Sequence, residues 1–258
     1  MQEELIVSAL QWNLKWCEPG QNRSEAEALM DQHPHTDAYI LPEMFTTGFT
    51  MEARENAEDM DGPTVNWMRK MADQRNALVC GSLIVKDKGK FFNRMVCVLP
   101  EGSLHFYDKR HLFSYAGEHK NYTAGQRLST FVFKGWKIKP LICYDLRFPV
   151  WSRNTDETDL ILYVANWPEA RCRAWNTLLN ARAVENLSYV IGVNRVGRDE
   201  NGIDYRGDTQ IIDCEGRVLA NLESNEGVVT VSLSATRLKK FRKRYPFLDD
   251  RDAFSLKI

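Results

Sequence analysis

WKIKPLICYDLRFP, residues 136–149, is the most informative segment of this chain. Its apolar part, 138–142, has the composition of a buried β-strand, and polar residues return directly after Cys143. A thiol is therefore expected where a strand enters a tight turn at the edge of a sheet. Backbone N–H groups of such a turn can lower the pKa of a thiol and can stabilise an oxyanion. Free cysteines are more often small buried apolar residues, so position alone leaves both interpretations of Cys143 open.

The N-terminal part of the chain predicts a strand, a helix and a second strand. Residues 5–12 and 37–41 are apolar runs, and 22–32 has helical spacing with Asn22 expected as the N-cap. Strands that are joined by a helix usually pair in parallel. The same order returns after Cys143, with strands at 160–165 and 189–194 around a helix at 171–187.

Other segments predict antiparallel pairing. Strands at 77–85 and 91–99 are joined by a short turn with glycine, which is typical of a hairpin, and a helix is expected at 63–75. Short closing strands precede a basic helix at 235–244 and a C-terminal tail from about residue 245. The pattern predicts an α/β protein with mixed sheets.

Composition excludes several classes of partner. The 258 residues carry a formal net charge of -1, which gives no overall attraction to nucleic acid or to an anionic membrane. No signal peptide or membrane-spanning run is expected. The six cysteines form no C-x-x-C pair and no zinc-finger spacing with histidine, so we expect no metal site and a cytoplasmic location. Five basic residues of the last helix are expected to form a solvated face, namely Lys239, Lys240, Arg242, Lys243 and Arg244.

Two further chemical groups follow predicted strands. Glu43 comes directly after 37–41, and Lys109 comes directly after a short strand at 104–107. Alone, such a glutamate more often bonds a neighbouring loop, and such a lysine is more often a solvated surface charge. Together with Cys143 they supply the base, the cation and the thiol that attack on a carbonyl or nitrile carbon requires.

The motifs around these residues resemble the nitrilase superfamily of carbon–nitrogen hydrolases, with the omega-amidase branch as the nearest likeness. The motifs are LPEMF at 41–45, YDKRHLF at 107–113 and ICYDLRFP at 142–149, in the family's order. The likeness runs from residue 5 to about residue 254. It implies a four-layer α-β-β-α sandwich with mixed sheets, one carbon-nitrogen hydrolase domain over 1–258, and assembly into a homodimer or a higher homo-oligomer.

The resemblance also implies a role for each site residue. Glu43 is the general base and Cys143 is the nucleophile, which forms a thioester. Lys109 and the backbone N–H of Tyr144 form the oxyanion hole. Glu118 falls where the family has a second glutamate that positions the lysine or the substrate. No metal and no organic cofactor is implied.

The omega-amidase likeness is supported by the segments 165–168 and 206–208, and it implies a small dicarboxylate monoamide as substrate. An example is 2-oxoglutaramate, which is hydrolysed to the 2-oxo acid and ammonia. The substrate carboxylate needs a clamp, for which Arg171 and Arg173 are candidates, although either is equally a surface or dimer-contact arginine. Three aromatic residues are candidate pocket walls or ordinary core residues: Phe45, Tyr115 and Trp167.

Several other functions remain open at this point. An amidase for N-carbamoyl amino acids, a metabolite-repair amidase for a damaged thiol peptide and a nitrilase would use the same catalytic groups. A catalytically silent binding protein of the same fold and a redox role for Cys143 are further alternatives.

Overall fold

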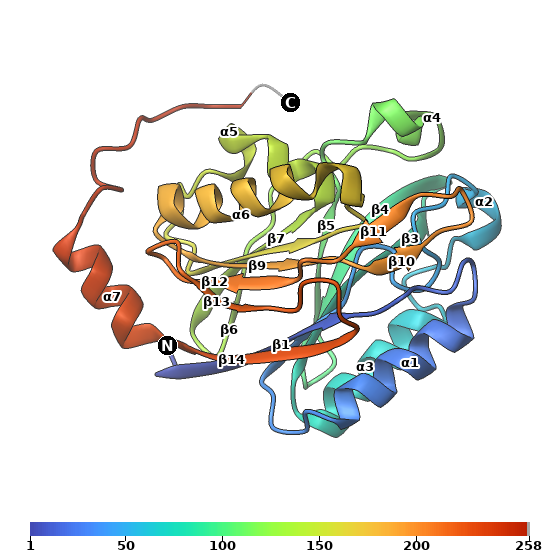
Figure 1. The fold of residues 1–258 in the computed structure, drawn as a ribbon, viewed down its shortest axis with the longest axis horizontal. Coiled ribbons are helices and arrows are strands. Elements are labelled where there is room, and N and C mark those ends of the chain that lie inside the picture. The colour runs from blue at the N-terminus through green and yellow to red at the C-terminus, as the bar shows by residue number, and fades with distance from the viewer. Residues whose placement is uncertain (257–258) are drawn as a thin grey trace.

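Two mixed β-sheets pack face to face in the computed structural model, which describes residues 1–256 (Figure 1). Within that range the first sheet has six strands, of which β1, β2 and β3 are parallel and the others antiparallel to their neighbours. In spatial order they are β14 (Gly227–Ser234), β1 (Glu4–Gln11), β2 (Ala38–Ile40), β3 (Leu78–Asp87), β4 (Lys90–Val98) and β5 (Leu104–Asp108).

The second sheet repeats this arrangement, with a parallel centre of β7, β8 and β9 and antiparallel edges. All five residues of β8 are buried, as expected for a parallel strand that is covered on both faces. A small separate hairpin joins β10 (Val196–Arg198) and β11 (Asp204–Arg206). The strands of the second sheet are β13 (Val218–Asn221), β12 (Gln210–Ile212), β9 (Tyr189–Val193), β8 (Leu160–Val164), β7 (Trp136–Ile142) and β6 (Phe131–Phe133).

Helices cover the outer face of each sheet, which confirms the predicted α-β-β-α sandwich (Figure 1). The first sheet is covered by α1 (Pro19–Asp31) and α3 (Pro63–Arg75), and the second by α5 (Pro149–Ser152) and α6 (Cys172–Asn186). The short helices α2 (Ala53–Asn56) and α4 (Glu118–Asn121) lie in loops, and α7 (Ala235–Arg244) follows β14.

Alternation along the strands divides the apolar side chains between the layers. Ala38 and Ile40 of β2 enter the core between the sheets. Tyr39 packs on the opposite face, in the cluster that contains Met68 and Met71 of α3. A fully buried side chain of the size of Ile40 contributes about 1.5–3 kcal/mol relative to an exposed one. Because one continuous core joins the two sheets, the ends of β2, β5, β7 and β8 keep a fixed relative position.

The structure corrects the predicted start of the first helix. Asn22 is not the N-cap, because α1 begins at Pro19, whose fixed φ suits the first turn of a helix. The side chain of Asn22 is buried and spans two loops instead. It accepts from the N–H of Lys15 at 2.8 Å and donates to the carbonyl of Thr46 at 2.8 Å.

The expectation for the basic helix is also only partly correct. Four of the five cations named above are exposed, but Arg242 is half-buried. Its guanidinium donates to the carboxylate of Asp159 at 2.9 Å and to the carbonyl of Leu187 at 2.8 Å. Arg242 therefore attaches α7 to the loops of the second sheet, which an inspection of charge spacing does not reveal.

Two further findings concern membrane-spanning helices and disulfides. No helix between residues 1 and 256 has the length and apolar character needed to span a membrane. None of the six cysteines takes part in a disulfide.

Candidate active site

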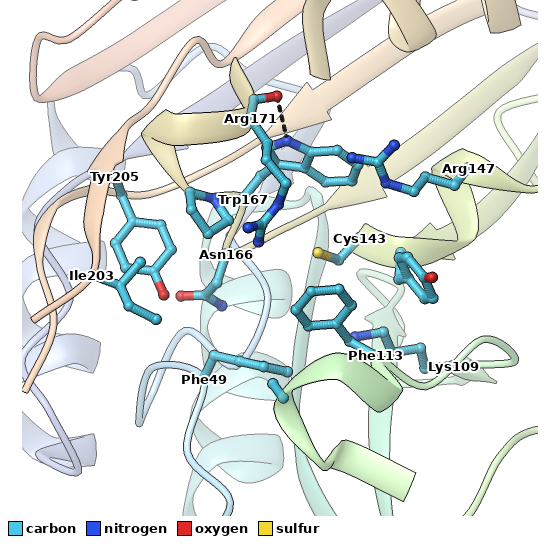
Figure 2. Close-up of a pocket in the computed structure, with 13 residues that line it drawn as sticks. Phe49, Lys109, Phe113, Cys143, Arg147, Asn166, Trp167, Arg171, Ile203 and Tyr205 are labelled. Carbon is cyan, nitrogen blue, oxygen red and sulfur yellow. Dashed lines mark hydrogen bonds between the residues drawn. The ribbon is translucent and has the colours of Figure 1, made fainter. Parts of the chain in front are cut away.

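Cys143 lies at the sharp turn between β7 and the 3-10 turn η2 (Cys143–Arg147). Its φ of +43° falls in the left-handed region, which residues other than glycine rarely adopt. Such a conformation costs about 1–3 kcal/mol and persists only where the surroundings enforce it. The turn directs the sulfur out of the sheet and into a pocket (Figure 2).

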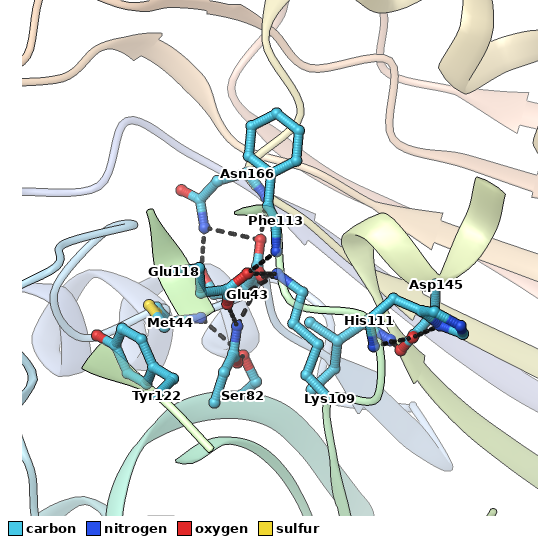
Figure 3. A network of polar contacts seen from close by, with 12 residues as sticks. Glu43, Met44, Ser82, Lys109, His111, Phe113, Glu118, Tyr122, Asp145 and Asn166 are labelled. Atoms are coloured by element: carbon cyan, nitrogen blue, oxygen red, sulfur yellow. Dashed lines mark hydrogen bonds and ion pairs between the residues drawn. The ribbon is translucent and has the colours of Figure 1, made fainter. Parts of the chain in front are cut away.

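The buried carboxylate of Asp145 holds this turn in place (Figure 3). It accepts hydrogen bonds from the backbone N–H of Ile142 at 3.1 Å and of His111 at 3.0 Å. The hydroxyl of Tyr107 also donates to it, and the indole of Trp151 donates to that hydroxyl at 2.9 Å. Burial and the Asp145 charge raise the pKa of Tyr107, so the phenol remains a donor. Since Tyr107 belongs to β5 and Ile142 to β7, the network aligns the two sheets at the site.

Glu43 and Lys109 meet beside this turn, although they follow different strands of the first sheet. Both side chains are fully buried, and Lys109 Nζ lies 2.8 Å from Glu43 Oε1 (Figure 3). The amide of Asn93 donates to the same carboxylate oxygen at 2.7 Å. The backbone N–H of Asn166, which follows β8, donates to Oε2 at 2.7 Å. The Glu43 carboxylate therefore receives hydrogen bonds from groups on both sheets.

Glu118 completes a buried cluster of charges around the ammonium. Lys109 Nζ lies 3.0 Å from each oxygen of the Glu118 carboxylate. The backbone N–H of Phe113 donates to Glu118 Oε2 from the same loop. Glu118 is the first residue of α4, and the amide of Asn93 donates both to it, at 3.3 Å, and to Glu43.

The charges of this cluster act on the sulfur. Burial lowers the pKa of Lys109, but Glu118 and Glu43 outweigh this effect and raise that pKa above its ordinary value. Burial first, and the Glu43 carboxylate second, raise the pKa of the Cys143 thiol well above its ordinary value. Burial raises the pKa of Glu118. The Lys109 ammonium acts in the opposite direction, and the Glu43 charge adds to the effect of burial. Burial and the nearby carboxylates therefore outweigh any lowering of the thiol pKa by the backbone N–H groups of the turn.

The sulfur opens into a partly enclosed pocket (Figure 2). Five of the thirteen residues that line it are aromatic, and Arg147 and Arg171 add positive charge to that of Lys109. Arg171 points its guanidinium between Trp167 and Cys143, and Arg147 lies 4.8 Å over the ring of Trp167. The remaining lining residues include Phe49, Phe113, Asn166, Ile203 and Tyr205.

Comparisons with known proteins give the family. The family model described as "Carbon-nitrogen hydrolase" matches residues 6–243, which is most of the chain. The chain belongs to the carbon-nitrogen hydrolase family. It is therefore a hydrolase that acts on non-peptide carbon–nitrogen bonds in linear amides.

Individual relatives agree with this family. The chain is 44% identical over 253 residues to the protein named omega-amidase YafV of Escherichia coli K12, covering 98% of each. It is 33% identical over 250 residues to the 2-oxoglutaramate amidase of Bacillus subtilis strain 168, covering 95% of this chain and 96% of that protein. A solved structure, XC1258 from Xanthomonas campestris, superposes with a TM-score of 0.96 at 44% identity, covering 99% and 100%. It is described as a CN-hydrolase superfamily protein with an arsenic adduct in the active site.

Three of the pocket residues expected from the sequence do not line the pocket of this carbon-nitrogen hydrolase. Phe45 is fully buried in the core under α3, with its ring 5.9 Å from that of Trp67. Tyr115 is 88% exposed on the surface, and Phe113 faces the pocket instead. Arg173 is exposed on α6 and lies outside the pocket. Trp167 and Arg171 do line it.

Sequence reasoning missed several residues of the site. Asn166 and Asn93 both hold the carboxylate of Glu43, and Arg147 and Tyr205 both line the pocket. Asn166 had a usable signal, because it is a polar residue directly after a buried strand, as Glu43 is. Tyr205 had none, since it comes from the small β10–β11 hairpin.

No metal centre is evident in the part of this carbon-nitrogen hydrolase that the structure describes. Among residues 1–256, no group of three or more His, Cys, Asp or Glu side chains is arranged to hold an ion. The chemistry that the site offers is that of a buried carboxylate, an ammonium and a thiol.

Proposed function

We propose that this protein is an omega-amidase that hydrolyses the terminal amide of small dicarboxylate monoamides, such as 2-oxoglutaramate, to the 2-oxo acid and ammonia. The meeting of Glu43, Lys109 and Cys143 beside one pocket, although they lie far apart in the chain, supports the hydrolytic chemistry. The names of the E. coli and B. subtilis relatives support the same substrate class.

The first half of the reaction forms a thioester. Glu43 takes the proton of the Cys143 thiol as sulfur attacks the amide carbon, and the carbonyl electrons move to oxygen. Lys109 and the backbone N–H of Tyr144 stabilise that oxyanion, while Glu118 positions Lys109. The C–N bond then breaks as Glu43 passes the proton to nitrogen, and ammonia leaves.

The second half releases the acid. Water attacks the thioester carbon and gives a proton to Glu43. The C–S bond breaks, and Glu43 returns the proton to sulfur. A resting thiol with a raised pKa suits this cycle, because the proton is transferred only when the carbonyl carbon is in place.

The substrate carboxylate is assigned to Arg171. Its guanidinium lies 5.3 Å over the ring of Phe113 and points into the pocket (Figure 2). A planar guanidinium binds a carboxylate through two parallel hydrogen bonds. Trp167 forms the adjoining wall, and its indole donates to the carbonyl of Arg171 at 2.9 Å, which fixes the loop that carries both residues.

An ammonia-release screen tests this function. Small omega-amides, 2-oxo amides, N-carbamoyl amino acids and nitriles are compared, with glutamine as a control for selectivity toward the 2-oxo form. We expect the highest kcat/KM with an omega-monoamide of a dicarboxylate and no turnover by Cys143→Ala, which still binds substrate. Turnover of nitriles or N-carbamoyl compounds alone would show that the proposed substrate class is wrong. Ammonia release by Cys143→Ala would show that the thioester mechanism is wrong.

We also propose that the protein is a cytoplasmic homodimer that pairs through the layer of α5 and α6. Six cysteines without a disulfide suit a reducing compartment. The pairing layer follows from the family resemblance, and Val150 of α5, which is 52% exposed, offers a position at which to test it. Light scattering of the purified protein is expected to give twice the chain mass, and Val150→Glu is expected to give the mass of a single chain.

A further inference from the structure

The side chain of Asn166 carries an oxygen atom that has no partner. Asn166 lies two residues after the end of β8, lines the pocket and is 5% exposed. Its Oδ1 is buried and accepts no hydrogen bond from any group in residues 1–256. Buried amide oxygens are nearly always paired, since desolvation without a partner costs free energy. An unpaired one at the wall of an active site points to a ligand that supplies the donor.

The surroundings of Asn166 fix which end of its amide faces the pocket. Nδ2 donates to the backbone carbonyl of Glu43 at 2.7 Å and approaches Glu43 Oε2 at 3.4 Å. If the amide were turned over, Oδ1 would face these two acceptors and be repelled by them. Asn166 Nδ2 must therefore face Glu43. Oδ1 then points away from the charged cluster of Glu43, Lys109 and Glu118 (Figure 3).

The nearby polar groups of the pocket are already committed. The hydroxyl of Tyr205 donates its proton to Asp199 Oδ2 at 2.9 Å. The ammonium of Lys109 donates to Glu43 and Glu118. Neither group supplies a proton to Asn166 Oδ1.

We propose that Asn166 Oδ1 accepts a hydrogen bond from the carboxamide nitrogen of the substrate and thereby selects amides over esters of the same acid. This inference rests on the proposed function, in which the departing nitrogen receives its proton from Glu43 and must lie beside it. Asn166 holds Glu43 through its amide nitrogen, and its oxygen lies on the Tyr205 side of the pocket lining (Figure 2). A substrate nitrogen that lies between Glu43 and this oxygen would meet both.

The chemistry of the two substrate classes differs at this atom. A primary carboxamide has two N–H donors on nitrogen, one of which satisfies Oδ1. An ester has only lone pairs on the corresponding oxygen and leaves two acceptors facing each other. A site that offers a buried polar partner discriminates strongly against an analogue that cannot pair with it.

Binding to the Cys143→Ala protein tests the inference without turnover. Calorimetry gives the dissociation constants of succinamate and of monomethyl succinate, and their ratio defines the amide preference. Asn166→Leu keeps the branched shape of asparagine but removes the acceptor. We expect it to lower the amide preference about tenfold. Should the leucine variant not fold, Asn166→Ala is measured in its place.

Asn93→Leu is the matched control, because Asn93 also donates to Glu43 but lies outside the pocket lining. It is expected to change the affinities for amide and ester by the same factor. An unchanged amide preference in Asn166→Leu, or an equal fall in Asn93→Leu, overturns the role of Oδ1. If the wild-type enzyme releases no ammonia from any omega-amide, the proposed function itself fails, which is a separate outcome.

Discussion

The hydroxyl of Tyr107 donates a hydrogen bond to Asp145 at 2.8 Å and so links β5 of one sheet to the turn that carries the thiol on the other. The strained backbone of Cys143 therefore depends on a carboxylate that four donors hold: the Tyr107 hydroxyl, the backbone N–H of Ile142, and the backbone and ring N–H of His111. This link is a structural requirement of the site, although Asp145 does not touch the pocket.

Replacing Asp145 by alanine is expected to lower the free energy of unfolding by about 2–4 kcal/mol, because its buried donors lose their acceptor. The loss is measured by urea denaturation. Asp61→Ala is the control, because Asp61 is exposed and pairs with Arg69 at the surface at 3.3 Å. Its effect should stay within about 0.5 kcal/mol. Equal effects of the two substitutions would contradict a structural role for Asp145.

Replacing Lys109 by methionine should abolish turnover and destabilise the fold by about 3–5 kcal/mol at neutral pH, since two buried carboxylates lose their counter-ion. The pKa of Glu118 is already raised by burial, and loss of the ammonium raises it further. A carboxyl whose pKa is raised by folding contributes stability below its unfolded pKa, near 4.5, and loses it as pH rises.

The stability deficit of Lys109→Met should therefore be smallest near pH 4.5 and grow toward pH 7. Thermal melting of variant and wild type across this range measures the difference. Lys240→Met, on the exposed face of α7, serves as the control and should show no such trend. A deficit that does not depend on pH would mean that the carboxylates are not the cause.

Glu43→Gln is expected to stop ammonia release while making the thiol more acidic. The Glu43 charge raises the pKa of Cys143, so its removal should shift the pH profile of Cys143 alkylation toward lower pH. Mass spectrometry of the iodoacetamide-labelled peptide follows this profile. The exposed Glu25→Gln should leave both properties unchanged. A profile that moves to higher pH would show that Glu43 does not act on the sulfur as described.

Arg171→Gln is expected to lower kcat/KM for succinamate about 10- to 100-fold, mainly through KM, because a charged hydrogen-bonding partner of the substrate is lost. Butyramide, which has no carboxylate, should be affected little. Arg173→Gln is the matched control, since Arg173 lies two residues away but is exposed outside the pocket. If the two variants behave alike, Arg171 is not the clamp.

Much of the fold was predictable because strands and helices leave periodic patterns in the sequence. Glu43, Lys109 and Cys143 each lie within three residues after the end of a strand, namely β2, β5 and β7. The roles of these residues and the single-domain organisation came from the resemblance, and they stay predictions.

The pocket walls were less predictable, because an irregular loop carries no period that tells which side chain faces inward. Phe113 and Tyr115 lie two residues apart around η1 (Ser114–Ala116), yet only Phe113 enters the pocket. Phe45 was placed wrongly because the left-handed backbone of Met44 turns the chain back toward the core after Glu43. Neither the inward direction of Phe113 nor the turn at Met44 follows from residue type.

The division of the site between the two sheets has a consequence for how the enzyme is inactivated. Glu43 and Lys109 are attached to one sheet, whereas Cys143 and Asn166 are attached to the other. A small slip of one layer over the other would pull base and thiol apart while both layers remain intact. We therefore expect the enzyme to lose activity at a urea concentration at which the circular dichroism of the protein is still unchanged. Turnover would then report the alignment of the two layers.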